Sequence, residues 1–159
     1  MADSASERTS GPPAEAWIEF AERELRVAGH RSSLPRTSIL ELIGRQDCVL
    51  TAQEIADRLR AGDRPVGVAT VYRTLDLLEE LKLVQRLDIG GGSARYEPAL
   101  PGGAHHHHHL VCDRCGRVTP FEDEPLEHAI EMLAKRLDYE VGEHDVILKG
   151  RCPRCGVTG

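Results

Sequence analysis

Two Cys-x-x-Cys pairs are the clearest chemical signal in this chain of 159 residues. Four thiolates can surround one Zn²⁺ ion as a tetrahedron, and the two residues between paired cysteines let both sulfurs turn toward the same ion. A glycine follows each pair, which suits a tight turn with a positive φ angle. A redox pair or buried thiols are the rival interpretations. We predict one closed structural zinc site, with the ligands Cys112, Cys115, Cys152 and Cys155.

Five consecutive histidines, residues 105–109, are followed by Leu110, Val111 and the first cysteine pair. The alternative to a functional role is a flexible tract. If the segment is a β-strand, successive side chains point to opposite faces, so the odd-numbered histidines share one face and the even-numbered ones the other. Such a strand can serve two metal sites back to back. Possible partner ligands elsewhere in the chain are Glu97, Glu127 and His144.

A third group of residues opens an expected helix that begins near Gly67. Its first turns carry a Thr, a Tyr and an Arg, where a recognition helix meets base edges and phosphates. The alternative is that the tyrosine packs in the core and the arginine is an ordinary solvated charge. We predict DNA contacts from this helix and from two basic residues upstream, with the candidate residues Arg31, Arg36, Thr70, Tyr72 and Arg73.

The elements that must position these groups follow from hydrophobic spacing and end signals. Helical spacing of Trp17, Ala21, Leu25 and Ala28 predicts a first helix over 14–28 that stops at Gly29. The further expectations are a helix beginning near Pro35, one opening with a capping box at Thr51, one over about 67–81, and strands over 83–87 and 94–97 around three glycines. The last three of these helices followed by a two-stranded hairpin have the order of a winged helix-turn-helix.

The second half predicts a different arrangement. A Pro- and Gly-rich segment over 98–104 cannot continue a helix or a strand, so we interpret it as a hinge. Beyond it the pattern predicts a strand over 105–112, a strand over 117–121, a helix over about 125–137 and a strand over 145–149. The predicted fold class is α+β. Its predicted parts are a disordered tail (1–13), a winged-helix domain (14–97), the hinge (98–104) and a small α/β domain with the four-cysteine zinc site (105–159).

Composition excludes several classes of protein. Hydrophobic residues make up 40% of the chain and charged residues 29%, which is typical of a globular protein. No apolar run approaches the roughly 18 residues that a membrane helix needs. Because no export signal precedes the Cys pairs, we expect a reducing cytoplasm and metal ligands rather than disulfides. The net charge is −6, yet residues 23–98 carry twelve basic and eleven acidic groups, so only this middle segment favours a polyanion.

The motifs together resemble the ferric uptake regulator family of metal-responsive repressors. The resemblance spans about residues 22–156, with the motifs in the same order and at nearly the same spacing. It rests on Leu34-Pro35-Arg36, Thr51-Ala52-x-Glu54, Gly67-x-Ala-Thr-Val-Tyr-Arg73, Gly91-Gly92 with Tyr96-Glu97, His105–His109-Leu-Val-Cys-x-x-Cys-Gly116, Glu127, His144 and Gly150-x-Cys-x-x-Cys155.

The resemblance implies a metal-dependent repressor that binds a palindromic operator in double-stranded DNA as a homodimer. It also implies a dimerisation role for the second domain and a structural zinc at the four cysteines. A regulatory site near the hinge corresponds to Glu97, His107 and His109. A second site within the dimerisation domain corresponds to His106, His108, Glu127 and His144.

Two positions depart from the family pattern at the regulatory site. Val49, with Cys48 beside it, stands where many members have a His, and Pro120 stands where many have a Glu. Cys48, Asp88 or water are the candidates to complete the ligand set. Glu97 with two histidines suits Fe²⁺ or Mn²⁺, and Zn²⁺ also accepts oxygen and nitrogen ligands. We expect Fe²⁺, with zinc-, manganese-, nickel- or peroxide-responsive regulation as alternatives.

Other function classes fit the sequence less well. A zinc hydrolase would want a helical His-Glu-x-x-His or a similar general base beside the ion, and no such motif occurs in the chain. A metal storage or chaperone protein would explain the histidine run but not the Thr-Val-Tyr-Arg helix. We therefore predict a regulator, not an enzyme.

Overall fold

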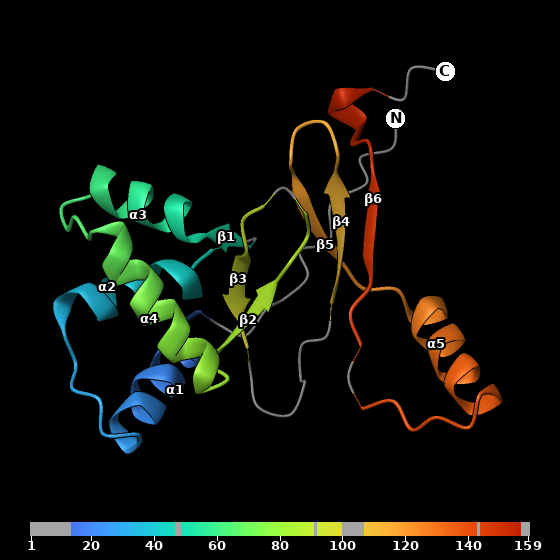
Figure 1. Cartoon of the computed structure of the whole chain (residues 1–159), viewed down its shortest axis with the longest axis horizontal. Helices are drawn as coiled ribbons and strands as arrows, with labels where there is room; N and C mark the ends of the chain where they lie inside the picture. The colour runs from blue at the N-terminus through green and yellow to red at the C-terminus, as the bar shows by residue number, and fades with distance from the viewer. Residues whose placement is uncertain (1–13, 47–48, 91, 100–106, 143, 157–159) are drawn as a thin grey trace. The chain divides into compact units, whose positions relative to one another are not determined.

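The computed structural model describes residues 14–46, 49–90, 92–99, 107–142 and 144–156 (Figure 1). These residues form two compact units, one ending at residue 99 and the other beginning at residue 107. The expected tail over 1–13, most of the expected hinge and His105, His106 and Cys48 lie outside the described residues.

The first unit contains the four expected helices. They are α1 (Ala14–Val27), α2 (Leu34–Gly44), α3 (Ala52–Ala61) and α4 (Val68–Glu80). The capping box is present at α3, because Thr51 Oγ1 accepts the Glu54 amide at 3.1 Å and Glu54 Oε2 accepts the Thr51 amide at 2.7 Å.

The first helix is shorter than expected. Ala28 was predicted to be its last inward residue, but it lies in the turn after α1 and is exposed. Gly29 adopts φ +85°, and the His30 amide donates to the Leu25 carbonyl at 2.8 Å. This left-handed ending satisfies an orphan carbonyl of α1 and turns the chain away from the core.

The inward faces of the four helices share one apolar core. Burial of one face per helix is what the 3.6-residue spacing predicts. The largest fully buried side chains of the core come from every helix of this unit, namely Trp17, Ile39, Leu40, Ile43, Ile55, Val71, Leu75 and Leu78.

The expected hairpin is present and is joined by a strand that the sequence did not reveal. Strands β2 (Val84–Leu87) and β3 (Arg95–Pro98) pair antiparallel. The two-residue strand β1 (Leu50–Thr51) pairs with the other side of β3, which gives the order β1-β3-β2. Two residues are too few to show a strand periodicity in the sequence. Arg95 Nη1 lies 3.2 Å from Glu54 Oε2 and links the hairpin to α3.

Gly44 permits the close packing of α1 on α2. A Cβ atom at this position would lie 2.7 Å from Ile18 Cγ1 and 3.0 Å from a ring carbon of Trp17. We expect Gly44→Ala to destabilise the protein by about 1–3 kcal/mol, because overpacking outweighs the gain in helix propensity. Thermal unfolding followed by circular dichroism measures this change. Gly62→Ala, where a Cβ meets only ordinary contacts, is the matched control; equal stability of the two variants would contradict the prediction.

The second unit is a three-stranded sheet with one helix. The strands β4 (His108–Cys112), β5 (Val118–Phe121) and β6 (Ile147–Gly150) lie in the order β5-β4-β6. Helix α5 (Glu124–Arg136) connects β5 to β6, and a short 3₁₀ turn, η1 (Pro153–Cys155), follows. The described strand β4 begins at His108, so His107 precedes it rather than lying within it as predicted.

The core of this second unit is thin. Among its described residues, the buried apolar side chains are Val111, Cys112 and Val118. All of α5 is described and none of its residues is buried. Across the described part of the chain, no helix is both long and apolar enough to cross a bilayer.

Candidate metal centres and DNA-contact surface

The four cysteines meet because of how the second unit's sheet is paired. Strand β6 runs parallel to β4, with Gly150 opposite Cys112. The second Cys pair begins two residues after Gly150, so it arrives beside the end of β4, where the first pair begins. Gly116 and Gly156 have φ angles of +70° and +75°, as the metal-binding turns require.

The geometry of the cysteine cluster fits Zn²⁺. All four Sγ atoms lie within 4.8 Å of one another, and Cys115 Sγ lies 3.7 Å from Cys152 Sγ. Zinc–sulfur bonds of about 2.3 Å in a tetrahedron place sulfurs about 3.8 Å apart. The cluster therefore has the size of a closed four-thiolate site.

Backbone amides prepare one of these cysteines as a thiolate. Hydrogen bonds from the backbone amides of Cys152 and Cys115 lower the pKa of Cys112 to about 6. The Cys152 amide nitrogen lies 3.3 Å from Cys112 Sγ. Side-chain hydrogen bonds with Cys115 and Cys152 raise the pKa of Cys155 to about 12. Because Zn²⁺ binds thiolates, metal binding at the cluster releases protons, so metal affinity should rise with pH.

A second cluster lies at the start of β4, four residues before Cys112. Glu127, in the first turn of α5, places Oε1 at 2.6 Å from His108 Nε2 and Oε2 at 3.0 Å from His144 Nε2. His108 is fully buried, and its ring also contacts Phe121 at a centroid distance of 5.4 Å.

One carboxylate thus bridges two imidazole rings, and the three possible donor atoms lie within 4.8 Å of one another. Two nitrogens and one oxygen suit zinc, iron or manganese. The structure brings His108, Glu127 and His144 together, while His106, the fourth ligand that the resemblance implies, lies outside the described residues.

His107 and His109 are neighbours on the opposite face from His108. Their ring centroids lie 4.9 Å apart. His109 is buried, and its amide donates to the Val146 carbonyl at 3.0 Å, which holds β4 against the start of β6. Glu97, the third residue expected at this site, is buried on β3 of the first unit.

Two of the three α4 residues expected to contact DNA, Tyr72 and Arg73, are exposed, and the third, Thr70, is half-buried. Tyr72 is 48% exposed and Arg73 is exposed, while Val71 and Leu75 of the same helix are buried. The alternative that Tyr72 is a core residue is therefore wrong. Arg73 Nε donates to the Ala69 carbonyl at 3.3 Å, which orients the guanidinium along the first turns of α4.

A hollow between α2 and α4 is lined by three of the residues expected to contact DNA, namely Arg36, Thr70 and Arg73. The other residues that line it are Ser33, Pro35 and Thr74. The sequence could not show that Arg36 and Arg73 line the same hollow, because they come from different helices and are brought together only by the packing of α2 on α4. Guanidinium and hydroxyl groups in one hollow are suited to a phosphate.

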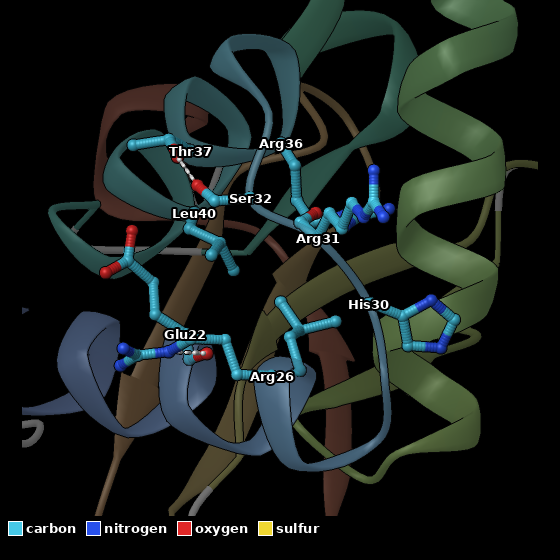
Figure 2. Close-up of a pocket in the computed structure, with 9 residues that line it drawn as sticks. Glu22, Arg26, His30, Arg31, Ser32, Arg36, Thr37 and Leu40 are labelled. Atoms are coloured by element: carbon cyan, nitrogen blue, oxygen red, sulfur yellow. Dashed lines mark hydrogen bonds between the residues drawn. The ribbon is translucent and has the colours of Figure 1, made fainter.

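Arg31 lies in an adjoining hollow that also includes Arg36 (Figure 2). The Arg36 guanidinium donates to the backbone carbonyl of Arg31, so the Arg36 side chain is held against the chain at residue 31. Opposite them the hollow is lined by Glu22, and the hydroxyl groups of Ser32 and Thr37 lie 3.4 Å apart. Sequence reasoning had not placed Arg31 and Arg36 beside each other.

Comparison with known proteins decides the family. The model of the ferric uptake regulator family matches residues 27–149, which is most of the chain. The chain belongs to the ferric uptake regulator family.

Individual relatives agree with this assignment. The ferric uptake regulation protein of Bacillus subtilis is 32% identical over 139 residues, covering 87% of this chain and 93% of that protein. The solved structure of the Vibrio cholerae ferric uptake regulator matches with a TM-score of 0.74 and 32% identity, over 82% of this chain and 98% of that one.

The Helicobacter pylori ferric uptake regulator, which has three functional metal-binding sites, matches with a TM-score of 0.78 and 25% identity over 94% and 96% of the two chains. As a ferric uptake regulator family member, this chain is a metal-responsive regulator with an α+β fold, a helix-turn-helix unit and a cysteine cluster. The predicted family and fold class are therefore confirmed.

Proposed function

We propose that this chain is an iron-responsive transcriptional repressor that acts in the cytoplasm. It binds a palindromic operator in double-stranded DNA as a homodimer and represses metal-uptake genes. The observation that carries the proposal is the exposed Tyr72–Arg73 face of α4 beside the Arg36 hollow, in a chain whose second unit gathers donor groups of three kinds.

Three roles follow for the donor groups. The cysteine cluster holds a structural Zn²⁺ that stabilises the second unit. His108, Glu127 and His144, with His106, hold a second ion within the same unit. Glu97, His107 and His109 hold the regulatory ion, which, when bound, supplies a link across residues 98–104. These three ligands then determine how tightly the regulatory ion is bound.

The regulatory link explains how metal concentration could control DNA affinity. Glu97 precedes residues 98–104 and the two histidines follow them, so ligands on both sides restrict how the two units move. Two recognition helices of a dimer reach successive major-groove half-sites only at a fixed spacing. A coupling of about 1–3 kcal/mol between the metal and DNA sites is enough to change affinity by one to two orders of magnitude.

The choice of iron rests on the donor set at the regulatory site. Pro120 lies directly opposite His109 in the β4–β5 pair, so the cross-strand position nearest this histidine offers no donor group. Val49 is a buried apolar residue of the first unit. Glu97 and the two histidines supply one carboxylate and two imidazoles, which suit Fe²⁺ and Mn²⁺; Cys48, Asp88 or water stay the candidates to complete the set. Zinc- or manganese-responsive repression is the second candidate, because Zn²⁺ accepts the same ligands.

The homodimer is supported by apolar surface on the second unit. Several large apolar side chains on α5, in the segment after α5 and on β6 are exposed to solvent. Exposed apolar patches on a protein surface mark interaction sites. A second copy of the chain would cover them and would supplement the thin core. These side chains are Met132, Leu133, Leu137, Tyr139, Val141 and Leu148.

We expect Arg73→Ala to weaken operator binding at least tenfold, because a charged group that meets phosphate or a base edge is lost. If Arg73 contacts a phosphate, the slope of log affinity against log salt should also fall by about one unit. Fluorescence anisotropy with a labelled palindromic promoter fragment, from about 50 to 200 mM salt, measures both effects. Arg60→Ala, an exposed arginine that pairs with Asp57 on α3, is the control. Unchanged affinity for both Arg73→Ala and Tyr72→Ala would move the contact surface elsewhere.

The deciding experiment compares metals. Zinc-loaded protein is titrated with the promoter fragment in the presence of Fe²⁺ under anaerobic conditions, of Mn²⁺, of additional Zn²⁺, and of no added metal. Iron-responsive repression predicts the largest gain in affinity with Fe²⁺. A larger gain with Zn²⁺ would establish the second candidate, and DNA binding that ignores every metal would contradict metal-dependent repression.

A further inference from the structure

The single tryptophan of the chain joins three segments of the first unit. Trp17 is fully buried on α1, and its Nε1–H donates to two carbonyl oxygens, those of Leu83 and Ala99, both at 3.1 Å. A buried indole N–H usually finds one acceptor. Here it is shared between the residue that precedes β2 and the residue that follows β3.

The two accepting residues are themselves bonded to each other. The Ala99 amide donates to the Leu83 carbonyl at 2.9 Å, which extends the β2–β3 ladder one residue beyond β3. The Leu83 amide donates to the Leu78 carbonyl of α4 at 2.8 Å, after Lys82 turns the chain with φ +55°. Continuous hydrogen bonds therefore run from the end of the recognition helix to Ala99.

Ala99 occupies a special place in the chain. It is two residues after Glu97, on the same face of an extended segment, and it directly precedes residues 100–106, which connect the two units. A residue at the end of a strand would fray easily if its amide made its only hydrogen bond. The indole holds the carbonyl side of Ala99 as well, so both backbone groups of this residue are fastened.

We infer that Trp17 is a positioning residue for metal regulation, because it fixes the point where the connecting segment leaves the DNA-binding unit. The inference rests on the proposed function. When the regulatory ion limits the movement of the connecting segment, that limit then acts on β3 and the end of α4 together. Without the indole N–H, the same restriction is absorbed by fraying at Ala99.

The experiment removes the N–H and keeps the shape. Trp17 is replaced in the full-length chain by 3-benzothienylalanine, in which sulfur takes the place of the N–H group, and in parallel by Phe. Leu25→Ala, a buried position on the same helix with no hydrogen-bonding atom in its side chain, controls for general loss of stability. Two quantities are measured: amide hydrogen exchange at Ala99 without regulatory metal, and the ratio of operator affinities with and without anaerobic Fe²⁺.

We expect the isosteric variant to exchange the Ala99 amide at least tenfold faster, as a locally opened strand end does. Its affinity ratio should fall about fivefold, which corresponds to one neutral hydrogen bond, while operator binding without metal stays within about twofold. Leu25→Ala should lower thermal stability without changing the ratio.

Three results would overturn the inference: unchanged exchange at Ala99, faster exchange with an unchanged affinity ratio, or an equal loss of the ratio in Leu25→Ala. A wild-type protein whose operator binding ignores Fe²⁺, Mn²⁺ and Zn²⁺ contradicts the proposed function itself, and with it the regulatory part of this inference. The two failures are distinguishable because the exchange measurement needs no regulatory metal.

Discussion

Cys112→Ser should remove the tightly held zinc and unfold the second unit. Cys112 ends the central strand β4 and is one of only three buried apolar residues among the described part of that unit. With so little apolar burial, folding must depend on the metal. Apparent binding free energies at structural zinc sites in small domains are about 10–16 kcal/mol, and this energy is folding energy.

Zinc content by mass spectrometry and unfolding by circular dichroism measure this outcome, and size-exclusion chromatography reports the loss of dimers. Cys48→Ser is the matched control, because Cys48 is the one cysteine outside the two pairs. A wild-type protein that carries no tightly held zinc would refute the assignment. A dimeric, fully stable Cys112→Ser protein that lacks zinc would show that the metal is bound but is not structural.

His109→Ala should abolish metal-activated operator binding and leave the zinc content of the cysteine cluster unchanged. His109 and His107 are the two ligands proposed on the far side of residues 98–104, and they lie side by side with ring centroids 4.9 Å apart. One histidine alone cannot anchor an ion that must also hold Glu97. The expected loss is the whole metal-induced gain, about 5–150-fold in affinity.

The adjacent variant His108→Ala provides the comparison. His108 points to the opposite face of β4 and contacts Glu127 at 2.6 Å, so its removal should cost less activation. Anaerobic Fe²⁺ titrations of operator binding for both variants separate the two faces. If both respond to metal like the wild type, or if His108→Ala is the more damaged, the division of the histidine run between two sites is wrong.

The chain's local chemistry was predictable without a structure. Capping at Thr51, the left-handed turns at Gly116 and Gly156, and the inward spacing of Val71 and Leu75 each involve residues within about two turns of one another. Interactions over such short separations depend on local backbone geometry, so their sequence signals are strong. The same holds for the ligand types in the two Cys pairs, because sulfur chemistry and pair spacing are properties of the sequence.

Errors in the sequence-based predictions occurred where local signals are weakest. Helical spacing continued through Ala28, yet Gly29 ended α1 one residue earlier. Strand β1 was missed because its two residues form a strand only by pairing with β3. A single φ angle, that of Gly29, decided where α1 ends, and pairing with a distant strand decided that β1 exists.

Tertiary structure alone decided which groups meet. The parallel register of β4 and β6 sets Gly150 beside Cys112, and the antiparallel register of β4 and β5 sets Pro120 opposite His109. The indole of Trp17 reaches a carbonyl 82 positions away. Sequence by itself determined the ligand types, the helices and the family motifs, because these depend on side-chain chemistry and short-range periodicity. Pairing register and helix packing bring distant residues together, and these are set by burial of the whole core, which no local pattern encodes.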